Sequence, residues 1–412
     1  MPRIIFHIDV NSAFLSWTSA ENLRTGAGPD LRTIPAVIAG DQASRHGIVL
    51  AKSIPAKAYG IYTSQPIAQA KRLCGDLVVA PPDRKLYSRC SHELMDYLRT
   101  LTPDIEQLSI DECFLDFTGI AHLYESPEKA AHEIKDTIRK RFGFTVNVGI
   151  SSNKLLAKMA SDFEKPDKVH TLFPEEIQKK MWPLPVSSLY MAGHSSTATL
   201  EKLGIRTIGE LALSDPALIS LHLKSHGRTL WEYANGFEDS PVLSTRAAAK
   251  GIGSSTTLSQ DLTDASEAKK ILKNLAEGIS TRLRAKHVRA GSICVEIKYA
   301  DFVSTSRQTQ LSTPADTTEQ ICRTAFVLFD QLWNQTPIRL LGIRTSRLTD
   351  VSEPVQLSLF DLEPKAAASS KKQKKLEEAL DTIRDRYGKD AVIRGDQALT
   401  SALKKSPRQT SH

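Results

Sequence analysis

Carboxylate side chains occur at two places in this sequence where a hydrophobic strand is expected. Asp9 follows the largely apolar run 4–8, and Asp111 and Glu112 lie inside segment 105–117, with apolar residues on both sides. A carboxylate among buried apolar residues is costly unless a cation neutralises it, so acids in these positions predict a metal site. Acids from two strands can hold a pair of Mg²⁺ ions, which is the chemistry of phosphoryl or nucleotidyl transfer.

Each acidic segment also has an ordinary structural explanation. An Asp at the end of a strand is often a turn residue or a helix cap, and an Asp-Glu pair often lies on a solvated hairpin. Neighbouring strand residues point to opposite faces, so Asp111 and Glu112 can serve one site only if a tight turn or bulge interrupts the pleat between them. The metal-site interpretation therefore predicts such a turn.

Length and composition indicate a multidomain protein. The chain has 412 residues, too many for one compact core, and 41% of them are hydrophobic. No apolar stretch approaches the roughly 20 residues that a membrane span needs, and the first residues lack a secretion signal. We therefore expect a cytoplasmic protein with no membrane partner. The five cysteines are scattered without Cys-x-x-Cys spacing, which predicts neither disulfides nor a zinc site.

The positive charge is concentrated in one region. The net charge is +7, and residues 243–348 carry 15 Lys and Arg against 9 Asp and Glu, a net +6. A near-neutral, acid-bearing front followed by a basic module is typical of an enzyme that acts on a polyanion. A solvated basic surface would give the same composition, and charge alone does not distinguish the two.

Hydrophobic periodicity predicts an α+β sheet that carries the acids. Expected strands at 4–10 and 145–150 flank an acidic hairpin, which itself lies between expected helices at 87–101 and 127–142. We also expect paired short strands at 36–40 and 47–51, mostly helical structure over 166–236, and a strand at 292–299. Near the end of the sequence, a flexible spacer is expected at 366–375. An amphipathic helix should follow it, with one apolar stripe formed by Leu376, Ala379, Leu380, Ile383 and Tyr387.

Three segments together resemble the Y-family translesion DNA polymerases, the group that includes bacterial DNA polymerase IV and UmuC-type proteins. They are segments 6–14, 109–116 and 149–166, and the resemblance extends over about residues 3–348. It implies an α+β multidomain fold shaped like a right hand. The implied domains are a palm at 1–165 with fingers inserted at about 20–80, a helical thumb at 166–240, a DNA-binding little finger at 241–348, and a tail at 349–412.

The resemblance also implies roles for individual residues. Asp9, Asp111 and Glu112 would be the catalytic acids that bind two Mg²⁺ ions, with the backbone carbonyl of Val10 as a further ligand. Phe14 matches the steric gate, a ring that excludes a 2′-hydroxyl from the sugar of the incoming nucleotide. Without the surrounding motif, Phe14 would be read as an ordinary core aromatic residue.

Two lysines match positions that bind the triphosphate, and the sequence departs from the family beside them. Lys165 matches a family lysine, whereas Lys57 stands where Arg is usual and Ile54 where Tyr is common. Lysine offers a point charge instead of a bidentate fork, and isoleucine has no hydroxyl. These departures predict weaker triphosphate binding. Asn11, often acidic in the family, and Ala13, often aromatic, are further departures.

A short peptide after the last domain resembles the bacterial sliding-clamp-binding motif. Its expected clamp-binding residues are Gln356, Leu357, Leu359 and Phe360. The tail offers little else to bury the apolar members, and such a peptide fills a surface pocket on its partner.

These features predict a monomeric, error-prone, template-directed DNA polymerase that performs translesion synthesis by two-metal nucleotidyl transfer. Its expected substrates are primer-template DNA and deoxynucleoside triphosphates, and its expected protein partner is the sliding clamp. The alternatives are a non-catalytic DNA- and clamp-binding relative, and a different palm-type enzyme such as a nucleotide cyclase. The basic module disfavours a cyclase, because that enzyme needs no grip on a polyanion.

Overall fold

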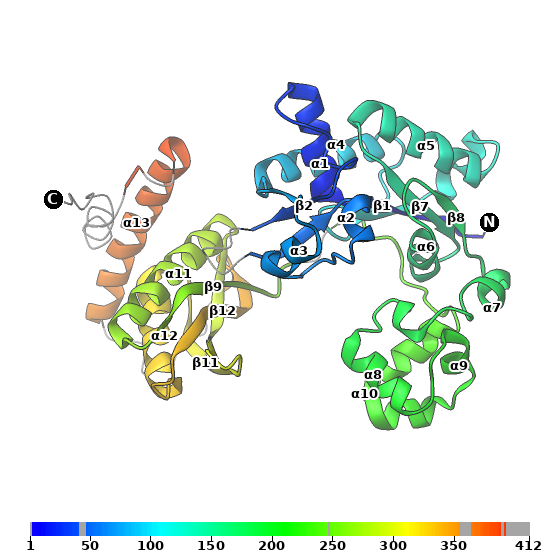
Figure 1. Cartoon of the computed structure of the whole chain (residues 1–412). Helices are drawn as coiled ribbons and strands as arrows, with labels where there is room; N and C mark the ends of the chain where they lie inside the picture. The colour runs from blue at the N-terminus through cyan, green and yellow to red at the C-terminus, as the bar shows by residue number, and fades with distance from the viewer. Residues whose placement is uncertain (1, 41–46, 246–247, 355–363, 389–390, 393–412) are drawn as a thin grey trace. The chain divides into compact units, whose positions relative to one another are not determined.

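The computed structural model describes residues 2–40, 47–245, 248–354, 364–388 and 391–392, with side chains omitted over 364–374. The chain divides into two compact units, Met1–Ala247 and Ala248–His412 (Figure 1). All five cysteines are free thiols, as their scattered spacing predicted. None of the described helices is long and apolar enough to cross a membrane.

A five-stranded sheet forms the centre of the first unit. Its order is β5-β6-β1-β7-β8, and β1 is antiparallel to both of its neighbours, whereas β7 and β8 are parallel. The predicted strands at 4–10 and 145–150 are present as β1 and β7, and β8 extends the sheet beyond Lys165. The bounds are β1 Ile5–Val10, β5 Ile105–Gln107, β6 Glu112–Asp116, β7 Val146–Ser151 and β8 Val169–Thr171.

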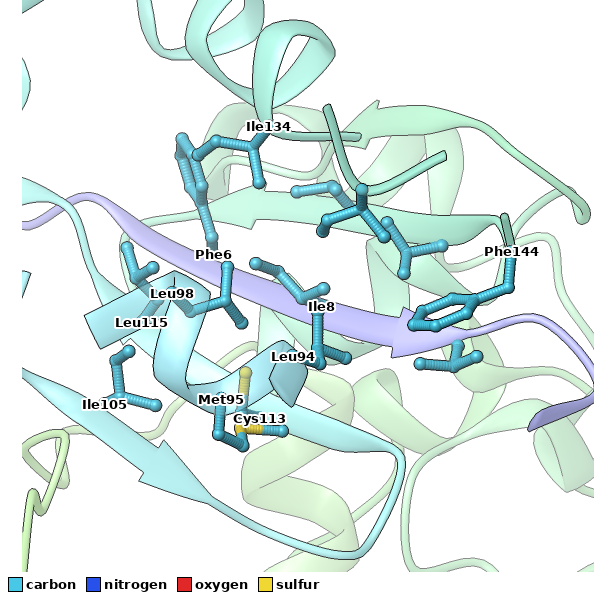
Figure 2. Close-up of a cluster of buried hydrophobic side chains, with 14 of the residues drawn as sticks. Phe6, Ile8, Leu94, Met95, Leu98, Ile105, Cys113, Leu115, Ile134 and Phe144 are labelled. Carbon is cyan, nitrogen blue, oxygen red and sulfur yellow. The ribbon is translucent and has the colours of Figure 1, made fainter. Parts of the chain in front are cut away.

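Alternation along β1 sends Phe6, Ile8 and Val10 to one face of the sheet, which helices α4 (Arg84–Arg99) and α5 (Pro127–Phe142) cover (Figure 1). Both predicted helices are present. Helix α4 begins three residues earlier than predicted because the Asp83 carboxylate accepts from the first backbone N–H groups. Figure 2 shows the resulting core, with Phe6 and Ile8 of β1 among Leu94, Met95, Leu98 and Ile134.

Helix α6 (Lys154–Ser161) packs on the other face of the sheet, against β1 and β7. This close approach depends on Gly149 of β7. A Cβ atom at Gly149 would lie 1.9 Å from the Ala157 carbonyl oxygen and 2.5 Å from the Ser161 backbone nitrogen. Both are backbone atoms of α6, so no side-chain rotation relieves the clash.

A Gly149→Ala variant should therefore displace α6 and lower the free energy of unfolding by about 1–3 kcal/mol or more. Gly75 provides a matched control, because a Cβ there would meet no atom within 4 Å. Chemical denaturation of both variants measures the difference. Equal stability of Gly149→Ala and Gly75→Ala would contradict the close packing of α6.

A three-stranded sheet, ordered β3-β2-β4, forms a smaller layer of the first unit. The predicted pairing of segments 36–40 and 47–51 is confirmed by the antiparallel register of β2 and β3. The elements of this region are α1 (Ala13–Thr25), β2 (Ala36–Ala39), β3 (Val49–Lys52), α2 (Ile54–Ala58), α3 (Ile67–Leu73) and β4 (Val78–Ala80).

Residues after β8 are mostly helical, as predicted. Gly204, with φ of +83°, makes the turn between α8 and α9, a conformation that glycine adopts without steric cost. The remaining elements of the first unit are the 3₁₀ helices η1 (Thr118–Leu123), η2 (Pro174–Glu176) and η3 (Val186–Ser188), and the helices α7 (Ile177–Lys180), α8 (His194–Lys202), α9 (Ile208–Leu213) and α10 (Pro216–Ala234).

The second unit is a four-stranded antiparallel sheet, ordered β11-β10-β12-β9, with α11 and α12 packed on it. The strand predicted at 292–299 lies within β10. The bounds are β9 Gly251–Leu262, α11 Ala265–Ala285, β10 Val288–Tyr299, β11 Ser304–Ala315, α12 Thr318–Leu332 and β12 Ile338–Asp350.

Two predictions about the C-terminal part are wrong. Segment 366–375, expected to be a flexible spacer, belongs to helix α13 (Pro364–Tyr387). The apolar stripe of that helix is not its buried face, because Leu376, Ile383 and Tyr387 are exposed while Glu377 is buried. Charged contacts to α11 and α12 hold the helix instead. The clamp-like peptide, Gln356 to Phe360, lies outside the described residues.

Candidate active site

The register of the central sheet makes two of the predicted acids direct neighbours. Asp9 of β1 pairs with Glu112 of β6. Residues opposite each other on antiparallel strands project to the same face, with Cβ atoms about 4.5–5.5 Å apart. His7 lies two residues before Asp9 and therefore points to this face as well. The other face carries the apolar core.

A bend before β6 places the third acid, as predicted. Strand β6 begins at Glu112, and residues 109–111 form the bend. The N–H groups of Leu108 and Ser109 donate to the Glu112 carbonyl at 3.1 and 3.3 Å, and the Val10 N–H donates to the Asp111 carbonyl at 3.0 Å. The predicted interruption of the pleat between Asp111 and Glu112 is thus present, and it frees Asp111 from the strand alternation.

Asp9 and Asp111 open into a pocket of about 550 Å³. Glu112 is absent from its lining, although it lies in register with Asp9. The residues predicted for metal binding, sugar discrimination and triphosphate binding that do line the pocket are Asp9, Val10, Asp111, Phe14, Lys57 and Lys165. Arg32, Lys52 and Ile54 line it too.

Asp9 is a poorly solvated carboxylate beside an ammonium group. Burial raises the pKa of Asp9, although the charge and hydrogen bond of Lys165 oppose the shift. The Lys165 Nζ also donates to Asp162 Oδ1 at 2.7 Å. A buried carboxylate of this kind is stabilised in its charged form by a nearby cation. Asp9 and Lys165, which the family resemblance predicts to share one site, are in contact.

Glu112 is held by two residues that the sequence analysis did not identify as functional, His7 and Lys158. His7 Nε2 lies 3.2 Å from Glu112 Oε2, and Lys158 Nζ donates to the same oxygen. Burial opposes ionisation of Glu112, but these hydrogen bonds and the Lys158 charge outweigh it and lower the pKa of Glu112 to about 2. Glu112 is therefore ionised at neutral pH.

His7 is itself fixed from its other side. Its Nδ1 atom lies 2.8 Å from Ser161 Oγ, and that hydroxyl donates to the Lys158 carbonyl at 2.8 Å. Burial lowers the pKa of His7, although its hydrogen bond to Glu112 opposes the shift. The strand alternation that aligns His7 with Asp9 was the available sequence signal. Lys158 had none, because it reaches Glu112 only through the packing of α6.

The donor set suits a hard divalent cation. Carboxylate oxygens and a backbone carbonyl are the ligands that Mg²⁺ prefers, and Asp9, Asp111, Glu112 and Val10 supply them. Within the described ranges, however, no group of three or more His, Cys, Asp or Glu side chains is arranged to hold a metal ion. The residues thus fit Mg²⁺ by chemical type, and the complete ligand set stays a prediction.

Phe14 is positioned by a stack of aromatic rings at the pocket wall. Its ring lies 4.5 Å from that of Tyr87 with an interplanar angle of 9°, and 6.2 Å from the Trp17 ring. Trp17 and Tyr87 are buried. The Phe14 ring lines the pocket and cannot retreat toward these neighbours without displacing them.

Two of the four family departures, Ile54 and Lys57, lie together on α2. Ile54, the first residue of α2, is 62% exposed, and Lys57 follows one turn later. The Ser53 hydroxyl caps the helix by accepting from the Ala56 N–H at 3.1 Å. Both Ile54 and Lys57 line the pocket, as the predicted triphosphate-binding role requires.

Two regions of the chain match a known protein family. Residues 8–162 match the impB/mucB/samB family, and residues 249–359 match the C-terminal domain of that family. These regions contain Asp9, Asp111, Glu112 and Phe14, together with most of the basic segment 243–348.

Whole-length relatives and a solved structure agree with this match. DNA polymerase IV of Clostridium acetobutylicum is 46% identical over 96% of this chain and 98% of its own length. DNA polymerase IV 1 of Bacillus subtilis is 35% identical over 99% of this chain and 95% of its own length. The solved structure of a Y-family DNA polymerase chimera, Dbh-Dpo4-Dbh, is 21% identical in sequence and matches with a TM-score of 0.73. The match covers 84% of this chain and 99% of the chimera, which shows the α+β polymerase fold. The chain therefore belongs to the impB/mucB/samB family of Y-family DNA polymerases.

Proposed function

We propose that this polymerase carries out translesion synthesis by metal-dependent nucleotidyl transfer at the pocket lined by Asp9 and Asp111. One observation supports the proposal above the others. A single pocket contains carboxylates from β1 and from the bend before β6, an aromatic ring from α1 and lysines from α2 and the loop after α6. A nucleotidyl transferase needs these groups together.

The side chains have separable tasks. Lys165 and Lys57 would bind the triphosphate, and the acids would hold two Mg²⁺ ions. When bound, these ions favour loss of the proton from the primer 3′-hydroxyl and neutralise the departing pyrophosphate. The primer oxygen then forms its bond to the α-phosphorus as the bond to pyrophosphate breaks. His7 and Lys158 would keep Glu112 ionised and oriented.

Primer extension across a template lesion tests the proposal. Full-length protein, Mg²⁺ and all four deoxynucleotides should extend a primer past an abasic site or a bulky adduct in the template. Extension that stops one nucleotide before every lesion would show a polymerase without the proposed bypass function. Extension of undamaged template in the same assay is the control for activity.

Replacing Phe14 should relax discrimination against ribonucleotides. In Phe14→Ala the ring that would meet the 2′-hydroxyl is absent, so we expect the ratio of kcat/KM for deoxynucleotides over ribonucleotides to fall by roughly 100-fold. Single-nucleotide incorporation measures both constants. Tyr87→Phe is the matched control, because it keeps the stacked ring and should keep the ratio. A Phe14→Ala enzyme that still rejects ribonucleotides would disprove the gate role.

Clamp binding through Gln356, Leu357, Leu359 and Phe360 is a proposal from sequence alone. The alternative of a non-catalytic DNA- and clamp-binding relative is not favoured, because relatives that match over nearly the whole chain are named DNA polymerases. The acids at positions 9, 111 and 112 also remain in place.

A further inference from the structure

We propose that Lys52, which was not among the predicted site residues, binds the polyphosphate of the incoming nucleotide. It would supply positive charge near Ile54 and Lys57, where the sequence departs from the residues usual in the family. This inference rests on the proposed function, because it requires a nucleotide in the pocket lined by Asp9 and Asp111.

The local structure aims Lys52 at the pocket. Strand β3 alternates, so Val49 and Ala51 are buried, at 0% and 8% exposure, while Leu50 and Lys52 are partly exposed and line the pocket with Ala51. The backbone after Lys52 is fixed, because the Ser53 N–H donates to the Ala36 carbonyl at 2.9 Å. The Lys52 side chain therefore starts from a rigid position at the pocket wall.

Lys52 differs from two other cations of the pocket in having no acid beside it. Arg32 is paired with Asp30 at 2.8 Å, and Lys165 is paired with Asp9 and Asp162. Across the residues that the structure describes, Lys52 has no carboxylate partner, and its Nζ atom contacts only Thr63 Oγ1, at 3.4 Å. Its positive charge is available to a ligand.

Among the residues that the structure describes, neither Lys52 nor the nearby Lys57 has a carboxylate partner. Burial, and then the charge of Lys57, lower the pKa of Lys52. Like charges held near each other are unfavourable until an anion binds between them. A polyphosphate provides that anion, and the ammonium group is a point charge that suits phosphate oxygens without demanding the planar geometry of guanidinium. Lys165, which also lines the pocket and contacts Asp9, would bind the same polyphosphate.

Steady-state incorporation of each of the four deoxynucleotides tests the proposal. Lys52→Met keeps most of the aliphatic stem and removes the charge, so KM should rise roughly tenfold for all four nucleotides, with a much smaller change in kcat. Lys52→Arg should restore most of the loss. Lys71→Met is the matched control, because Lys71 is an exposed lysine of α3 that does not line the pocket, and its KM should not change.

The possible outcomes separate this inference from the proposed function. A wild-type protein that extends primers, together with an unchanged KM in Lys52→Met, would overturn the Lys52 assignment and leave the polymerase function intact. A rise confined to one nucleotide would also overturn it, because it would show contact with the base. An equal rise in Lys71→Met would reveal a general charge effect. Inhibition by pyrophosphate, weakened in Lys52→Met but not in Lys71→Met, would support the phosphate contact independently.

Discussion

An Asp111→Ala variant should lose primer extension by roughly a factor of 10³ or more while remaining folded. Metal-assisted stabilisation of the transferring phosphoryl group is worth several kcal/mol, and each 1.36 kcal/mol is a factor of ten in rate. Single-turnover extension with saturating DNA and nucleotide measures the loss. Asp96→Ala is the control, because Asp96 is an exposed acid of α4 that lies outside the pocket.

Asp111 is the acid best suited to this experiment because its side chain contributes little to the fold. Its carboxylate accepts from Ser109 Oγ at 2.5 Å, whereas the bend is held by backbone groups, including the Val10 N–H to Asp111 carbonyl bond. These backbone bonds survive the substitution. Activity within tenfold of wild type at saturating Mg²⁺ would therefore exclude Asp111 from the metal-binding set.

Glu112 requires a more conservative change. Its removal would leave Lys158, whose side chain is 14% exposed, and the buried His7 without their shared acceptor. Glu112→Ala thus combines a structural defect with any catalytic one. Glu112→Gln keeps an acceptor for both neighbours and removes only the charge. We expect this variant to match wild type in thermal unfolding and to match Asp111→Ala in lost extension.

The position of the acids could be predicted because local rules decide it. Alternation along β1 separates Phe6 and Ile8 from Asp9, and one site for Asp111 and Glu112 is possible only with a bend between them. Both rules operate over a few residues. The structure adds the register, which pairs Asp9 with Glu112 across a long separation in the sequence.

The groups that hold Glu112 could not be predicted in the same way. Lys158 reaches Glu112 because α6 lies close to the sheet, and that approach depends on the missing Cβ at Gly149. Tertiary packing of this kind leaves no periodic pattern in the sequence. Lys52 escaped prediction for a related reason, since its proposed role depends on its having no acid beside it among the described residues, which only the folded structure shows.

Helix α13 shows the opposite failure, in which a clear pattern gave a wrong interpretation. Its apolar residues predicted a buried stripe, but charge pairs decide which side packs on the second unit. The Arg284 guanidinium contacts Glu377 and, at 2.7 Å, Asp381, and Arg384 contacts Glu277 at 2.7 Å. Leaving a buried charge without partners is far more costly than exposing a leucine. The hydrogen bonds to these charges therefore outweigh the tendency of the apolar residues of α13 to be buried.

Glu377→Ala should therefore destabilise the second unit by about 3–5 kcal/mol, the usual cost of removing one partner from a buried ion pair. Glu377 is 2% exposed and accepts from the Thr318 N–H at 3.0 and 3.2 Å, at the N-terminus of α12. Its loss removes this acceptor from the Thr318 N–H and leaves Asp381 as the carboxylate that still contacts Arg284. Hydrogen exchange on the full-length protein should show faster exchange at Thr318. Glu378→Ala, an exposed neighbour, is the control.

A second substitution separates loss of charge pairing from loss of helix docking. Replacing both members of the Glu377–Arg284 pair, as Glu377→Leu with Arg284→Met, removes these two buried charges together and leaves Asp381 with the Thr281 hydroxyl as a donor, so it should cost less than Glu377→Ala alone. If the double variant is as unstable as the single one, the lost hydrogen bond from the Thr318 N–H to Glu377 accounts for most of the destabilisation. If Glu377→Ala leaves exchange at Thr318 unchanged, α13 is not docked on α12 in solution. Helix α13 would then be flexible in solution, as the sequence predicted for segment 366–375.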